Sequence, residues 1–79
     1  MEIHRSLDVT GVDDDEITHA IAHLLVVDDL GEDPDRWLVI GPDRAGNLLE
    51  MVALISSDGN EFAIHAMPMR PKYRKLLEP

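Results

Sequence analysis

Two side chains near the end of the sequence have the types needed to move a proton and to bind an anion. His65 can take up or release a proton near neutral pH, which suits general acid and base catalysis. Arg70 follows beyond Pro68 and can stabilise a phosphate whose negative charge grows in a transition state. The pair predicts a catalytic site for a reaction at a phosphate, although a partly buried sheet histidine beside solvated cations would show the same pattern.

Cations gather around this pair in a chain that is otherwise acidic. The formal net charge of −9 argues against a general affinity for nucleic acid, whose phosphates bind Lys and Arg. Residues 62–77 contain no acid, so this part of the sequence can attract an anion that the remainder repels. The residues predicted to bind substrate are Lys72, Tyr73, Arg74 and Lys75.

A β-hairpin is expected to position His65. Residues 48–56 and 61–67 are apolar and strand-like, and Asp58 with Gly59 predicts a tight two-residue turn between them. This turn sets a register in which one face of the hairpin is wholly apolar. The expected pairs on that face are Ile55 with Phe62, Ala53 with Ile64, and Met51 with Ala66.

The opposite face of the same hairpin carries the polar side chains. There the register places His65 across from Val52 and diagonal to Glu50, within reach of long side chains. Glu50 is therefore expected to orient or repolarise the imidazole. The predicted catalytic residues are His65, Arg70 and Glu50.

A helix is predicted to begin near Asp13. Asp13 and Glu16 have the spacing of a capping box, and Val12 with Ile17 has the spacing of a hydrophobic staple. The helix is expected to end near Val27. Its buried stripe consists of Ile17, Ala20, Ile21, Leu24 and Leu25.

The remaining pattern places the chain in the α+β class, as a single domain of residues 1–79. Residues 36–41 predict a further strand, and Pro71 suits the first position of a short helix. Residues 2–8 fit either a helical turn or an edge strand. The expected architecture is an N-terminal helix packed on a three-stranded antiparallel β-meander, followed by a short C-terminal helix.

No pattern predicts a cofactor or a metal site. His19 and His23 lie four residues apart with Glu16 on the same side, but a third strong ligand is missing, so a solvated helix face is the simpler interpretation. The chain has no cysteine to form a disulfide, and a homodimer is one expected source of stability. Without a signal peptide or an apolar run of ~20 residues, we expect a cytoplasmic location and no membrane partner.

The order of the elements and the last strand resemble a known class of toxin. A helix begins near Asp13, strands follow with Gly46 to Glu50, and the segment from Ile64 to Arg74 contains an Ile-x-Ala motif followed by basic residues. This pattern is similar to the small BrnT-type or RelE-like toxins of bacterial toxin-antitoxin pairs. The resemblance covers most of the chain.

The resemblance implies a metal-independent endoribonuclease that cleaves messenger RNA and is neutralised by a cognate antitoxin protein. By position, His65 would transfer the proton and Arg70 would bind the phosphate, with support from Lys72 and Arg74. Met67 stands where such toxins carry an arginine. The alternative is a non-enzymatic protein–protein interaction module, such as a homodimer, that uses the same basic patch.

Overall fold

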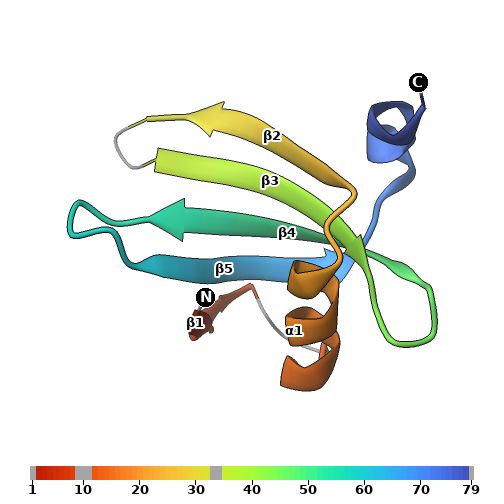
Figure 1. Cartoon of the computed structure of the whole chain (residues 1–79), viewed down its shortest axis with the longest axis horizontal. Coiled ribbons are helices and arrows are strands. Elements are labelled where there is room, and N and C mark those ends of the chain that lie inside the picture. Colours follow the sequence, from red (N-terminus) through yellow and green to blue (C-terminus); the bar gives the residue numbers. More distant parts are fainter. Residues whose placement is uncertain (1, 9–11, 33–34, 79) are drawn as a thin grey trace.

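A twisted β-sheet forms the framework of the chain, with one α-helix against one of its faces (Figure 1). The computed structural model describes residues 2–8, 12–32 and 35–78. The strands are β1 (Glu2–Asp8), β2 (Val26–Gly31), β3 (Asp35–Pro42), β4 (Leu48–Ile55) and β5 (Glu61–Pro68). The helices are α1 (Asp14–Ala22) and the 3-10 helix η1 (Pro71–Leu77).

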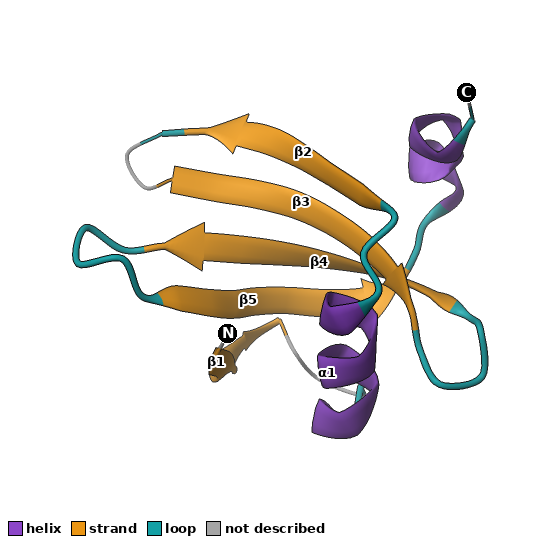
Figure 2. Ribbon diagram, in the orientation of Figure 1, coloured by secondary structure: helices purple, strands orange, loops and turns teal. Residues whose placement is uncertain are grey.

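The strand order in the sheet is β1-β5-β4-β3-β2. Strands β2 to β5 form an antiparallel meander, and β1 pairs with β5 in the parallel direction. The α+β class is confirmed, as are the helix near the N-terminus and the three strands over 36–41, 48–56 and 61–67. Figure 2 shows that η1 stands beyond the end of the sheet, after β5.

The prediction of only three strands was incomplete, because β1 and β2 belong to the same sheet. The predicted helix was also too long, since α1 ends at Ala22 and not near Val27. The β-branched pair Val26 and Val27 pairs with Ile40 and Val39 of β3, and this pairing replaces the last helical turn. The two aspartates that follow in β2 obscured the strand, because such residues are rare inside sheets.

The predicted capping box does not form at the start of α1. Asp13 is the N-cap residue, and its carbonyl oxygen accepts hydrogen bonds from Glu16 N and Ile17 N at 3.0 and 3.1 Å. The Asp13 side chain makes no capping hydrogen bond. Glu16 instead accepts hydrogen bonds from Arg44 N and Nε, so this carboxylate ties α1 to the β3–β4 loop.

The hairpin between β4 and β5 has a loop one residue longer than predicted. Ser56 N donates to Asn60 O, and Gly59 N donates to Ser56 O, each at 2.9 Å. Gly59 closes the loop with a φ of 89°, a backbone conformation that favours glycine. As a result Leu54, not Ile55, pairs with Phe62, and Ala53 pairs with Ala63 in place of Ile64.

A β-bulge in β5 then restores the predicted register. The extra residue in β5, Ile64, lies between the pair Ala53–Ala63 and the pair Val52–His65, and Met51 pairs with Ala66 as expected. Because of the bulge, Ile64 faces the same side of the sheet as His65, while Ala63 and Ala66 are buried on the other side. The predicted placement of Ile64 on the apolar face was therefore wrong.

The core lies between α1 and one face of the sheet. Its buried residues are Ile17, Ala20, Val39, Leu49, Met51, Ala63 and Ala66. The helix approaches β3 so closely at Gly41 that a side chain there has no room. A Cβ atom on Gly41 would overlap the carbonyl oxygen of Ala20 and stand 3.0 Å from the carbonyl carbon.

We expect Gly41→Ala to lower the free energy of unfolding by about 3 kcal/mol, because the methyl group forces α1 away from β3. Gly46→Ala is the matched control. Gly46 has open space around it and a φ of 88°, so the loss there is limited to backbone strain of about 1 kcal/mol. Urea unfolding measures both variants. Equal losses would contradict the close helix approach.

Candidate functional site

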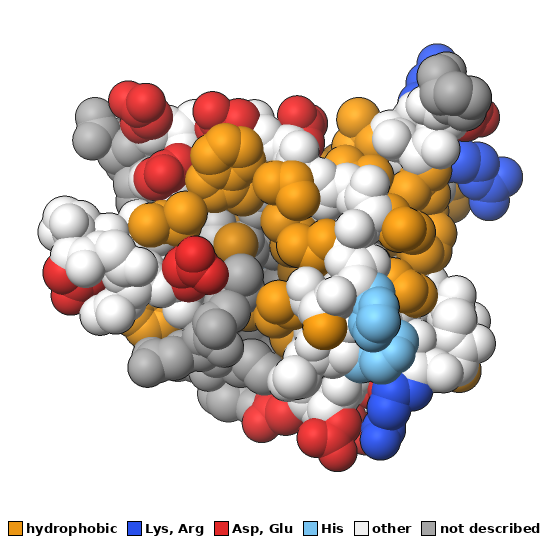
Figure 3. Space-filling view, in the orientation of Figure 1, with side chains coloured by type: hydrophobic (Ala, Val, Ile, Leu, Met, Phe, Trp, Pro, Cys, Tyr) orange, Lys and Arg blue, Asp and Glu red, His pale blue; other side chains and the backbone are white. Residues whose placement is uncertain are grey.

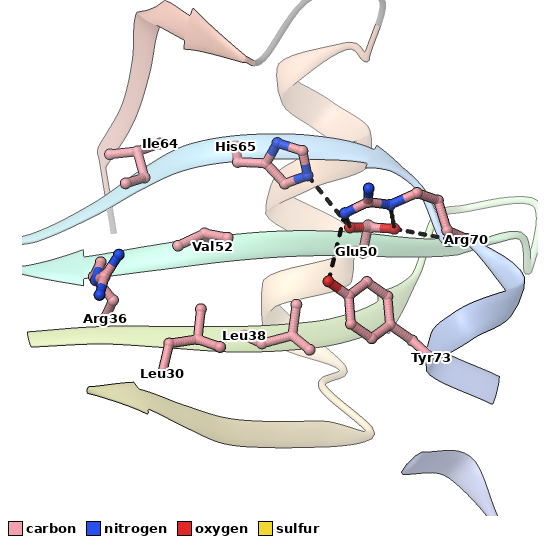
Figure 4. Close-up of a pocket in the computed structure, with 9 residues that line it drawn as sticks. All are labelled: Leu30, Arg36, Leu38, Glu50, Val52, Ile64, His65, Arg70 and Tyr73. Carbon is pink, nitrogen blue, oxygen red and sulfur yellow. Dashed lines mark hydrogen bonds and ion pairs between the residues drawn. The ribbon is translucent and has the colours of Figure 1, made fainter. Parts of the chain in front are cut away.

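A pocket lies on the sheet face that points away from α1 (Figure 4). It has a volume of about 380 Å³. Successive side chains of a strand point to opposite faces of the sheet. Leu38 and Val52 are adjacent in sequence to the core residues Val39 and Met51, so they point to the face opposite the core. The lining residues are Leu30, Arg36, Leu38, Glu50, Val52, Ile64, His65, Arg70 and Tyr73.

A buried carboxylate holds one end of this pocket together. Glu50 is only 1% exposed and accepts two parallel hydrogen bonds from the Arg70 guanidinium, Nε to Oε1 and Nη2 to Oε2, each at 2.9 Å. The Arg70 backbone N also donates to Oε1 at 2.8 Å. This geometry combines charge and shape complementarity, so Glu50 fixes both the backbone and the side chain of Arg70.

The charges of the two partners favour each other. Burial would raise the pKa of Glu50, but the hydrogen bonds from the side chain and backbone of Arg70 outweigh it and lower that pKa from its ordinary value of 4.5. The same hydrogen bond to Glu50 raises the pKa of Arg70. Glu50 is therefore a carboxylate at neutral pH in spite of its burial.

Glu50 also contacts the candidate proton-transfer group. His65 Nε2 lies 3.4 Å from Glu50 Oε2, and the His65 side chain is 20% exposed at the pocket. Both oxygens of Glu50 are thus engaged below the surface. Glu50 is a positioning residue for His65 and Arg70, and the imidazole is the group that can reach a ligand.

Tyr73 is the residue through which η1 contributes to the pocket. Its hydroxyl oxygen accepts a hydrogen bond from Arg70 Nη2 at 3.4 Å, and the Arg70 guanidinium carbon lies 5.5 Å from the ring centroid. Lys72 Nζ lies 5.0 Å from the same centroid, so its cation stacks on the aromatic ring. The other predicted substrate-binding residues, Arg74 and Lys75, are exposed and do not line the pocket.

Arg36 is a pocket residue that the sequence interpretation missed. It projects from β3 at the opposite end of the pocket from Arg70, as Figure 4 shows. Its register partner in β4 is Leu54, and it lies two residues before Leu38 on the same face. Alternation along Arg36-Trp37-Leu38 places Arg36 and Leu38 on the same face of the strand. Only the β3–β4 pairing shows that this face is the one that carries Glu50 and Val52.

His19 of α1 and His23, which follows the helix, have no third metal ligand beside them among the described residues. His19 and His23 place their ring centroids 4.5 Å apart, and His19 Nδ1 donates to the carbonyl oxygen of Pro42 at 2.9 Å. Glu16 is occupied by Arg44. Among residues 2–8, 12–32 and 35–78, no group of three or more His, Cys, Asp or Glu side chains is arranged to bind a metal.

The chain matches no protein-family model, no curated protein and no solved structure. Within the described part of the chain, no helix is long and apolar enough to cross a membrane.

Replacing the buried carboxylate tests the site's central contact. We expect Glu50→Gln to lower the free energy of unfolding by about 2 kcal/mol at pH 7, because Arg70 loses its charged partner. The folded-state pKa of Glu50 is lowered, so its contribution is complete above the ordinary value of 4.5 and is lost as the pH falls through the folded pKa.

Urea unfolding of both proteins should accordingly show a difference that shrinks as the pH falls below 4.5, the ordinary pKa of this carboxyl group. Glu61→Gln serves as the control, since this exposed glutamate lies at the far end of β5. We expect it to change stability by less than about 0.5 kcal/mol at pH 7. A pH-independent loss in Glu50→Gln would contradict the charged pair.

Proposed function

We propose that this chain is a toxin-like, metal-independent endoribonuclease of a bacterial toxin-antitoxin pair, which cleaves single-stranded RNA in the pocket between Arg36 and Arg70. A cognate antitoxin protein and a cytoplasmic location, where its messenger RNA substrate is found, are parts of this proposal. One observation carries it. His65, Arg70 and Tyr73 converge on one pocket, and a buried Glu50 holds the first two in place.

The proposed reaction uses the ribose of the substrate as its own nucleophile. His65 removes the proton of a 2′-hydroxyl, whose oxygen then attacks the adjacent phosphorus. The bond from phosphorus to the 5′-oxygen breaks, and that oxygen takes a proton from water. The products are a 2′,3′-cyclic phosphate and a free 5′-hydroxyl, so the reaction needs no metal ion.

Arg70 is proposed to stabilise the charge that develops on the phosphate. Its bonds to Glu50 use Nε and Nη2, and within the described chain Nη1 makes no hydrogen bond, so this nitrogen remains for a ligand. A guanidinium held rigidly by a carboxylate loses little freedom when it binds an anion. The side chain is 44% exposed, which gives the phosphate access.

The remainder of the pocket fits an unpaired nucleotide. Leu38, Val52 and Ile64 form an apolar floor, and the ring of Tyr73 offers a face on which a base can stack. Arg36 at the other end can bind a neighbouring phosphate. The local cations therefore offset the acidic net charge where the substrate binds.

Cleavage of a fluorescent single-stranded oligoribonucleotide in EDTA tests this proposal. We expect His65→Ala to lower kcat by about a hundredfold or more. Arg36→Ala should raise KM about tenfold with little change in kcat, because it removes binding of a phosphate that does not react. An oligonucleotide with a 2′-deoxyribose at the cleaved position should remain intact.

Arg44→Ala is the matched arginine control, because Arg44 lies on α1's side of the sheet and pairs with Glu16. It should leave both kinetic constants unchanged. Intact RNA after incubation with wild-type protein at high concentration would refute the ribonuclease proposal, as would equal losses in Arg36→Ala and Arg44→Ala.

The second candidate is a non-enzymatic protein–protein interaction module, in the form of a homodimer, that uses the C-terminal basic patch. The observation that favours it is the exposure of Lys72, Arg74 and Lys75 on η1, outside the pocket. Sedimentation of wild-type protein and of a variant with these three residues changed to alanine tests this candidate. A homodimer through the basic patch requires the wild-type protein to sediment as a dimer and the variant as a monomer. The ribonuclease proposal requires no such change.

A further inference from the structure

A second hollow lies on the other face of the sheet, beside α1. The helix has only nine residues and covers one end of this face, near Ala20 and Gly41. The uncovered part forms a groove of about 260 Å³. The residues that line this helix-side groove are Leu24, Val27, Trp37, Val39, Ala53, Ile55 and Glu61.

The groove is bordered by apolar side chains that remain in water. Val27 is 58% exposed at its margin, and Leu25, just before β2, is 63% exposed. Figure 3 shows that apolar side chains reach the surface across the middle of this face. A contiguous apolar surface of this kind marks a site of interaction with another molecule, because its exposure to water is unfavourable.

Carboxylates surround this apolar surface. The register puts Asp29 opposite Trp37, Asp35 opposite Ile55, and Glu61 opposite Ile55 on its other side, so all three acids share the face of the groove. In Figure 3 acidic side chains lie next to the central apolar region, whereas the basic side chains are seen towards the edge of the molecule. A ligand for this face must therefore combine apolar groups with positive charge.

The charge also disfavours a second copy of the same face as the occupant. A symmetric dimer would bring each set of Asp29, Asp35 and Glu61 close to its equivalent. Within the described sheet, β2 pairs only with β3, and its outer edge carries Asp28 and Asp29. Pairing of two such edges would again place like charges together, which is unfavourable.

We propose that the helix-side groove binds an amphipathic segment of a different protein, with apolar side chains seated on Val27, Trp37 and Ile55 and with Lys or Arg beside Asp29, Asp35 and Glu61. The groove and the pocket of His65 are on opposite faces of the sheet. This inference therefore goes beyond the ribonuclease proposal and does not depend on it.

The position of Trp37 supplies a direct measurement. It is the sole tryptophan of the chain and lines the groove, so its fluorescence reports what the groove contains. The probe is a synthetic amphipathic peptide of Leu and Lys. We expect a saturable shift of the Trp37 emission to shorter wavelengths, and an affinity that falls as salt is added.

Val27→Glu separates groove binding from general attraction between a basic peptide and an acidic protein. The variant blocks the apolar contact but adds a negative charge, so groove binding should weaken at least about tenfold while general attraction would strengthen. Leu76→Glu is the control, because it adds the same charge to an exposed leucine of η1 and should retain the wild-type affinity.

Three outcomes would overturn the proposal. The first is equal affinity of wild-type protein and Val27→Glu for the peptide. The second is equal binding of a peptide in which every Lys is replaced by Glu. The third is a wild-type dimer in sedimentation that Val27→Glu dissociates, because a second copy would then occupy the groove. None of these three outcomes depends on whether the pocket cleaves RNA, so the groove proposal and the ribonuclease proposal can fail independently.

Discussion

The contact between Glu50 and Arg70 is the interaction on which one end of the molecule depends. A carboxylate this deeply buried is costly unless its charge is matched and its oxygens are hydrogen-bonded. Arg70 meets both needs through three hydrogen bonds to the two oxygens. In return it is held where the chain leaves the sheet, just before η1. The direction of the last helix thus follows from an electrostatic requirement inside the sheet face.

Strand alternation lets one small sheet serve two surfaces. Each of β3, β4 and β5 contributes residues both to the core under α1 and to the pocket, by alternation along β3 and β4 and with the bulge at Ile64 in β5. Because α1 is short, part of its own face also stays open. The described part of this small chain therefore presents a hollow on each face of the sheet.

The sequence predicted much of the site because the site is mostly local to one hairpin. The pairing of His65 with Val52 was predicted from the turn signal, and it holds because the bulge at Ile64 compensates for the longer loop. Tyr73 was included because it follows Arg70 closely. Arg36 was missed since its place depends on the pairing of β3 with β4 across a separate turn.

The errors in the fold prediction have a similar origin. Strand β2 was read as a helix end and a loop, because Leu24 and Leu25 continue the helical period and the acids that follow disfavour strands. Only the pairing of Val26 and Val27 with β3, a tertiary contact, decides against the helix. Local patterns cannot supply that information.

The β4–β5 hairpin also determines how this sequence can change. The longer loop at Ser56 to Asn60 displaces the register by one residue, and the bulge at Ile64 displaces it back before His65 is reached. Deletion of one residue within the loop would leave the flanking residues with the same partners, so His65 would stay opposite Val52 on the pocket face. The length of this loop can therefore change without moving the imidazole from the pocket to the core.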